Sequence, residues 1–271
     1  MFSIILIFIC GLFVGSFLNV LVDRLPKGKS VIGGRSHCDH CKKKIAWYDL
    51  IPVLSFFLLK GKCRYCHTSL SFYYPVIEMT TGIMFVATTF FVLNNFQFSI
   101  FNFQSNLNFQ LQQIPTLFYY LFIVSSLIVI FFADLKYGII PDKVIFPSIV
   151  IAFLYLLLNT YYIIPFFFAG IGAFAFFFLL FIVTRGKGMG FGDVKFAFLM
   201  GLILGFPNTA IALYIAFLTG ALIGCILIVW KRKKLAGTKI PFGPFLVFGT
   251  IAGLFFGDRI MQLVIRFLFP L

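Results

Sequence analysis

Two aspartates stand where long apolar runs meet polar sequence. Asp134 directly follows the apolar run 116–133, and Asp193 lies between the glycine-rich stretch 184–192 and another apolar run. A carboxylate beside hydrocarbon costs free energy unless it faces water or protein, so an acid at such an edge is a candidate functional residue. The chain has only eight acidic residues, which makes the position of these two informative.

Two carboxyl groups held close together provide the chemistry of an aspartic protease. Like-charge repulsion keeps one of them protonated at neutral pH while the other is ionised. The ionised acid takes a proton from water as the water attacks a peptide carbonyl, and the protonated acid donates to the carbonyl oxygen. If Asp134 and Asp193 meet in the fold, they are predicted to form the catalytic pair of a peptide hydrolase.

An acid after glycine at the start of an apolar run also fits a simple helix cap. Four alternating glycines precede Asp193, at positions 186, 188, 190 and 192, and they add backbone entropy with no evident capping purpose. Because glycine lets another backbone approach closely, Gly190 and Gly192 are predicted to line a substrate-binding loop. This feature favours the catalytic interpretation of Asp193.

The same acids would also suit a second class of function, a proton- or cation-coupled membrane transporter. That class predicts acids near the middle of membrane helices and a pair of interrupted helices repeated in the two halves of the chain. Neither pattern occurs in the sequence, so an enzyme is favoured over a transporter.

Four cysteines form two CxxC pairs and are predicted to bind a structural zinc ion: Cys38, Cys41, Cys63 and Cys66. Each pair offers two thiolates from one turn, as tetrahedral zinc requires. Disulfide bonds are the alternative. The basic charge of the surrounding loop indicates the cytoplasm, a reducing compartment in which disulfides rarely persist, so zinc is favoured. Three neighbouring histidines are interpreted as solvated: His37, His40 and His67.

The composition decides what kind of scaffold positions these groups. The chain is 61% hydrophobic and only 11% charged, which predicts an all-α polytopic membrane protein and excludes a soluble globule. The net charge of +14 could suggest a nucleic-acid partner. The lysines and arginines, however, fall in short loops between apolar runs, so membrane lipid is the expected partner and nucleic acid is not.

About eight transmembrane helices are predicted. Of the 22 lysines and arginines, all but Arg259 and Arg266 fall in or at the edge of loops that then share one face. The positive-inside rule makes that face cytoplasmic and both termini external. A short amphipathic interfacial helix is predicted for 259–271. The predicted spans cover about 2–22, 75–93, 116–133, 144–158, 166–183 and 194–206, a seventh that ends at Trp230, and 242–257.

Four segments are therefore expected. The first transmembrane helix, 1–22, precedes a cytoplasmic four-cysteine loop domain at 23–74. The second helix and an uncharged external loop occupy 75–115. A six-helix membrane core at 116–271 holds both candidate catalytic acids.

Five motifs carry a family resemblance. They are Gly15-Ser16-Phe17-Leu18-Asn19-Val20 with Arg24-Leu25-Pro26, the four-cysteine loop, Ala133-Asp134-Leu135-Lys136-Tyr137-Gly138-Ile139-Ile140-Pro141-Asp142, Gly190-Phe191-Gly192-Asp193, and Ile240-Pro241-Phe242-Gly243-Pro244-Phe245. In this order, over nearly the whole chain, the sequence resembles the type IV prepilin peptidases, intramembrane aspartyl proteases of the GxGD group.

The resemblance implies a location and a reaction. The chain would lie in the bacterial plasma membrane and remove the basic leader from prepilins or pseudopilins at the cytoplasmic face, with Asp134 and Asp193 as the catalytic pair. It also implies N-methylation of the new N-terminus with S-adenosylmethionine. No dinucleotide-type fingerprint accompanies that implied activity, so its ligand residues stay unassigned.

Three further polar residues have simpler predicted roles. Asp142 is interpreted as a helix-start residue, and Asn19 is expected to form a hydrogen bond between helices. Glu78, the only acid within the second span, lies either at the headgroup boundary or at a methyl-donor site.

Overall fold

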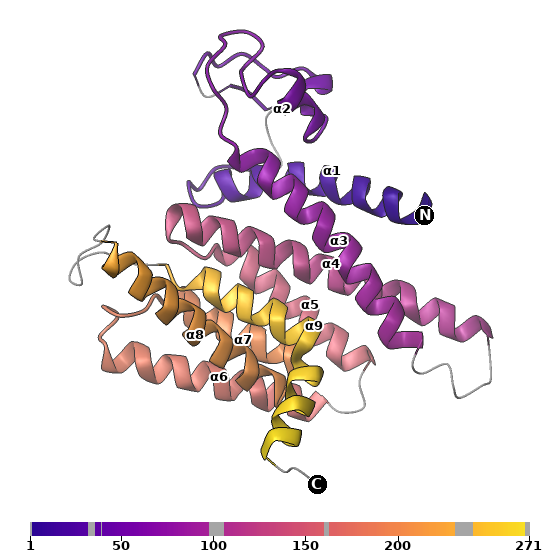
Figure 1. The fold of residues 1–271 in the computed structure, drawn as a ribbon, viewed down its shortest axis with the longest axis vertical. Coiled ribbons are helices and arrows are strands. Elements are labelled where there is room, and N and C mark those ends of the chain that lie inside the picture. Colours follow the sequence, from indigo (N-terminus) through magenta and orange to yellow (C-terminus); the bar gives the residue numbers. More distant parts are fainter. Residues whose placement is uncertain are drawn as a thin grey trace. The chain divides into compact units, whose positions relative to one another are not determined.

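The computed structural model describes residues 2–31, 36–38, 40–97, 106–159, 163–230 and 241–268, and in these ranges the fold is helical (Figure 1). β-Pairing within these ranges is limited to two isolated bridges in the four-cysteine loop. The elements are α1 (Phe2–Arg24), η1 (Trp47–Leu50), α2 (Leu54–Leu58), α3 (Tyr73–Gln97), α4 (Asn106–Tyr137), α5 (Asp142–Asn159), α6 (Ile163–Val183), α7 (Phe191–Leu204), α8 (Asn208–Val229) and α9 (Gly243–Leu268).

Each predicted span corresponds to a helix, which confirms an all-helical polytopic membrane protein. Six of the described helices are long and apolar enough to cross a bilayer: α1, α3, α4, α6, α8 and α9. The other two predicted spans are α5 and α7. With 14 residues, α7 is only about 21 Å long, less than the about 30 Å of a hydrocarbon core, and ten of its residues are buried. It is an internal helix packed against its neighbours.

Three predicted boundaries differ from the structure. Helix α9 continues to Leu268, so the predicted separate helix at 259–271 is instead the end of α9 over its described part. The predicted loop 94–113 is partly helical, because α3 runs to Gln97 and α4 begins at Asn106. A helix extends cheaply once nucleated, so polar flanks add turns that hydropathy does not reveal. The basic run 231–234 lies outside the described residues.

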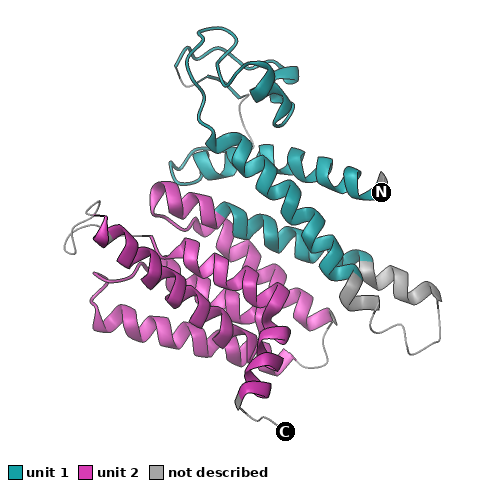
Figure 2. Cartoon of the chain, in the orientation of Figure 1, with its two compact units in different colours: residues 1–129 teal, residues 130–271 magenta. Residues whose placement is uncertain are grey.

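The chain divides into two compact units, residues 1–129 and 130–271 (Figure 2). In the first unit α1 packs closely on α3. A Cβ atom on Gly15 would lie 2.7 Å from Glu78 Cα, and one on Gly11 would lie 2.7 Å from Gly82 Cα. These glycines let the two backbones touch, and the four-cysteine loop joins the ends of the two helices (Figure 1).

In the second unit α7 is the central helix. It packs against α6 at a crossing where any Cβ atom on Gly201 would overlap the backbone of Gly170. It also contacts α5, α8 and α9. Because α7 is enclosed in this way, its N-terminus, which carries Asp193, has a defined position within the unit.

Candidate active site

Asp134 lies in the last turn of α4, and only 5% of its surface is exposed. Its Oδ2 atom accepts a hydrogen bond from the backbone N–H of Gly243, at 2.9 Å. Gly243 is the first residue of α9, so the N–H and the positive end of that helix both face the carboxylate. A Cβ atom at Gly243 would lie 2.5 Å from Oδ2, so this contact requires glycine.

An aromatic cluster holds the start of α9 in place. The ring of Phe242, directly before Gly243, lies against Phe217 with the centroids 5.2 Å apart and against Phe177 at 6.3 Å. Phe177 is fully buried. This packing fixes the Gly243 N–H that binds Asp134.

Asp193 lies in the first turn of α7 and is 7% exposed. Its Oδ2 atom accepts a hydrogen bond from the backbone N–H of Gly190, the N-cap residue, at 3.1 Å. Asp193 therefore does cap the helix, the alternative role considered for it from the sequence. It engages Oδ2, and a carboxylate has a second oxygen. Capping and catalysis are compatible at this residue.

The two aspartates come together within the second unit, close enough for their like charges to interact. The turn after α4 contributes to this arrangement, because buried Ile140 packs against Gly192. A Cβ atom on Gly192 would lie 3.1 Å from that of Ile140. The segment that follows Asp134 thus contacts the segment that precedes Asp193.

The glycine stretch also has folding roles that the sequence did not reveal. Gly186 has a φ of +69°, a conformation that side chains disfavour, and its N–H bonds to Phe181 O beyond the end of α6. Gly192 makes room for Ile140, whereas at Gly190 a Cβ atom would meet nothing closer than Asp193 Oδ2, at 3.6 Å. Gly190 remains the better candidate for contact with a substrate.

Asp142 is the exposed first residue of α5, as predicted. Its Oδ1 atom pairs with Lys195 Nζ at 2.6 Å. Lys195 also lies over the rings of Phe146 and Phe191. Although Lys195 follows Asp193 by two residues, its ion-pair partner is Asp142.

The four cysteines gather in the first unit, with their sulfur atoms all within 4.8 Å of one another. Cys38 Sγ and Cys66 Sγ are 3.8 Å apart. Four sulfurs at the usual Zn–S bond length of about 2.3 Å form a tetrahedron with edges of about 3.8 Å, so this cluster fits zinc. All six cysteines of the chain are free, which contradicts the disulfide alternative.

The two CxxC turns are built alike. Lys42 N–H bonds to Cys38 O and His67 N–H to Cys63 O, each at 2.9 Å, and Lys42 and His67 both have φ near +55°, at 57° and 53°. The Thr68 hydroxyl and backbone N–H lower the pKa of the Cys66 thiol to about 6, which favours the thiolate that binds metal. Although the Lys43 N–H acts to lower it, burial and the neighbouring Cys66 and Cys38 thiols raise the pKa of the Cys41 thiol to about 11. The three nearby histidines are exposed, as expected for solvated side chains: His37, His40 and His67.

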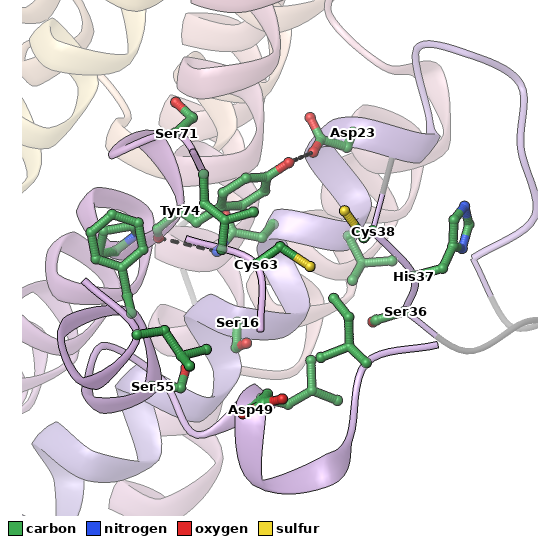
Figure 3. A pocket seen from close by; sticks show the side chains of 18 of the residues that line it. Ser16, Asp23, Ser36, His37, Cys38, Asp49, Ser55, Cys63, Ser71 and Tyr74 are labelled. Carbon is green, nitrogen blue, oxygen red and sulfur yellow. Dashed lines mark hydrogen bonds between the residues drawn. The ribbon is translucent and has the colours of Figure 1, made fainter. Parts of the chain in front are cut away.

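The first unit also contains a cavity of about 460 Å³ (Figure 3). Glu78, 8% exposed, lines it, and its Oε2 accepts a hydrogen bond from Val53 N–H at 2.7 Å. Asn19 lines it as well and donates from Nδ2 to Tyr74 O, at 3.2 Å, which confirms the predicted bond between helices. Sequence reasoning missed the cavity, although the motif around Gly15–Val20 and Arg24 supplies part of its wall.

Two family models match the chain. The N-terminal domain of bacterial A24 peptidases matches residues 9–92, and the type IV leader peptidase family matches residues 121–225. The second range includes both aspartates. The first includes all four cysteines and Glu78.

Relatives named prepilin leader peptidase/N-methyltransferase align over nearly the full length. The protein of Bacillus subtilis (strain 168) is 33% identical over 268 residues, covering 96% of this chain and 97% of the relative. That of Stutzerimonas stutzeri is 26% identical, covering 96% and 92%. That of Aeromonas salmonicida (strain A449) is 28% identical, covering 95% and 92%. No solved structure matches the chain. On this full-length similarity, the chain belongs to the type IV leader peptidase family, the A24 aspartic peptidases.

Proposed function

We propose that this protein removes the leader peptide from type IV prepilins or pseudopilins, with Asp134 and Asp193 as the catalytic pair. The observation that carries the proposal is a pair of buried carboxyl groups whose like charges interact, each hydrogen-bonded to the N–H of a glycine at a helix start. Membership of the peptidase family supports the same reaction. The full-length relatives carry prepilin leader peptidase in their names.

The proposed mechanism divides the work between the two acids. The ionised carboxylate takes a proton from a water molecule, whose oxygen attacks the scissile carbonyl of the leader. The protonated carboxyl donates to the carbonyl oxygen, and proton return to the amine releases the new N-terminus. Glycine N–H groups hold both side chains in place throughout, and the absence of a side chain at Gly190 would let an extended substrate backbone approach Asp193.

The proposed orientation places the four-cysteine loop domain, 23–74, in the cytoplasm and both termini outside. The distribution of lysine and arginine along the chain supports it. In this arrangement 1–22 and 75–115 flank the loop domain, and 116–271 forms the protease core. A leader rich in basic residues would then be cleaved on the cytoplasmic side.

A second activity is proposed for the same chain, N-methylation of the cleaved pilin. It is supported by the methyltransferase half of the relatives' names and by a loop whose four sulfurs fit structural zinc. S-adenosylmethionine would supply the methyl group as an electrophilic methyl on a sulfonium. The zinc would hold the loop in shape and take no part in either reaction.

The test is co-expression of each variant with a prepilin, followed by mass measurement of the pilin N-terminus. Asp134→Asn and Asp193→Asn keep an oxygen acceptor for Gly243 and Gly190 but lose the ionisable group. Each is expected to abolish leader removal while the protein still inserts. The matched control Asp142→Asn alters an exposed acid nearby and should cleave normally. Full cleavage by both active-site variants would refute the assignment.

A further inference from the structure

The cavity of the first unit is enclosed by three parts of that unit (Figure 3). Ser16, Asn19 and Asp23 come from α1, and Tyr74 and Glu78 come from α3. The four-cysteine loop closes the remaining wall with residues that include Ser36, Cys38, Asp49, Ser55 and Cys63. The volume of about 460 Å³ falls within the about 300–1,000 Å³ of sites that bind small molecules.

Asn19 leaves a polar atom of this wall without a partner. The residue is only 6% exposed, and its Nδ2 is held by Tyr74 O, which fixes the orientation of the amide. Its Oδ1 atom is buried and accepts no hydrogen bond from the protein. A buried acceptor without a donor destabilises the fold. A ligand N–H or O–H donor in the cavity would remove that cost.

Carboxylates line the same part of the cavity and are held in place by neighbours. Tyr74 OH donates to Asp23 Oδ2 at 3.1 Å, and Val53 N–H donates to Glu78 Oε2 at 2.7 Å. Asp49 adds a third acid on the loop side, where it pairs with Arg64 at 2.6 Å. The lining also holds four basic residues, so the cavity suits a ligand that carries both positive and negative groups: Arg24, Lys27, Lys29 and Arg64.

The remaining walls suit the other parts of such a ligand. Basic residues at the end of α1 and just beyond it, Arg24 and Lys27, line the cavity and could face a carboxylate. Phe56, Tyr65 and Tyr74 contribute aromatic surface, on which a base can stack. The cavity therefore combines acidic, basic and aromatic side chains with one buried acceptor that lacks a donor, Asn19 Oδ1.

We propose that this cavity binds S-adenosylmethionine and is the methyl-transfer site, with Asn19 and Glu78 among the residues that bind the donor. This inference rests on the proposed methyltransferase function. The donor carries two positive groups, a sulfonium and an ammonium, which the acids of the cavity would bind. The basic residues would bind its carboxylate, and the aromatic rings would stack on its adenine. In the reaction, the pilin amine nitrogen forms a bond to the methyl carbon as the carbon–sulfur bond breaks. The bonding electron pair stays on sulfur, and one proton of the original ammonium leaves to water.

The first experiment measures binding by equilibrium dialysis of radiolabelled S-adenosylmethionine against the purified full-length protein. Asn19→Ala removes the orphan acceptor and is expected to weaken binding about fivefold, and Glu78→Gln removes a charge and is expected to weaken it about tenfold. Leader cleavage by both variants should equal that of the unmodified protein, which also shows that they fold.

A matched control is available in the second unit. Asn208 likewise donates from Nδ2, to Asp258 at 3.0 Å, and likewise has a buried Oδ1 without a partner. It does not line the cavity, so Asn208→Ala should bind the donor normally. Normal binding by both Asn19→Ala and Glu78→Gln would overturn the assignment of the cavity.

A second experiment needs no variant. Ultraviolet cross-linking of radiolabelled S-adenosylmethionine to the unmodified protein, followed by peptide mapping, should label residues within 16–78. Label confined to 130–271 would contradict the proposal. If the unmodified protein neither binds the donor nor adds a methyl group to cleaved pilin, the methyltransferase function itself is wrong, whereas methylation with label elsewhere refutes only the location.

Discussion

Both units hold carboxyl groups near helix ends, but they surround them differently. In residues 130–271, the like charges of Asp134 and Asp193 interact, and each carboxyl group accepts a hydrogen bond from a glycine N–H within helical packing. In residues 1–129, Glu78 and Asp23 line a cavity that the four-cysteine loop helps to form. Hydrolysis by paired acids needs two carboxyl groups that share a proton, whereas methyl transfer needs space for a donor. This difference is the basis for proposing one site for each reaction.

Among variants that distinguish the two units, the largest effect is expected from those that lose the metal. Cys38→Ser or Cys63→Ser removes one of four sulfurs that lie within 4.8 Å of one another, and both residues also line the cavity. We expect about one zinc per chain in the unmodified protein, and we expect the zinc to be lost in each variant and methylation to fall with it. Cleavage should suffer less. Elemental analysis and pilin mass spectrometry check both.

The control for that prediction is a cysteine outside the cluster. Cys225 lies on α8 and is exposed, so Cys225→Ser should keep zinc and both activities. A metal-free protein that still methylates normally would show that the cluster has no structural role.

A smaller effect is expected in the other unit from Gly243→Ala. The added Cβ atom would lie 2.5 Å from Asp134 Oδ2, so the carboxylate or the start of α9 must shift. We expect cleavage to fall on the order of 10- to 100-fold, as a displacement of about 1 Å in a catalytic group costs. Rates on purified enzyme measure this, and methylation of mature pilin should be retained.

Gly224 supplies the matched control, because a Cβ atom there meets nothing within 4 Å. Gly224→Ala should leave both rates unchanged. Equal rates for Gly243→Ala and the unmodified protein would remove the proposed role of the Gly243 N–H in positioning Asp134.

The smallest effect is expected at the ion pair beside the acids. Asp142 is exposed, with 57% of its side-chain surface accessible, so its bond to Lys195 should contribute less than about 1 kcal/mol to stability. Asp142→Asn should therefore lower the midpoint of thermal unfolding only slightly and leave cleavage intact. A loss of cleavage comparable to that of Asp193→Asn would assign Asp142 a direct role.

Hydropathy and local spacing were enough to predict the helices and the two CxxC turns, and they placed Asp134 and Asp193 at helix ends. Contacts between residues far apart in the sequence could not be predicted from hydropathy or local spacing. Asp134 and Gly243 are 109 positions apart, and nothing near either residue indicates their hydrogen bond. The cavity likewise depends on α1, α3 and the loop folding together. The extension of α9 was missed because polar residues end a hydropathy signal without ending a helix.

The most direct test of two separate sites uses a protein that cannot cleave. Purified Asp193→Asn enzyme is given mature pilin with a free N-terminus and S-adenosylmethionine, and the mass of the pilin N-terminus is measured. Separate sites predict methylation at the rate of the unmodified enzyme. Absence of methylation in a correctly folded, zinc-containing Asp193→Asn protein would contradict them, because the second unit's acids would then be required for both reactions.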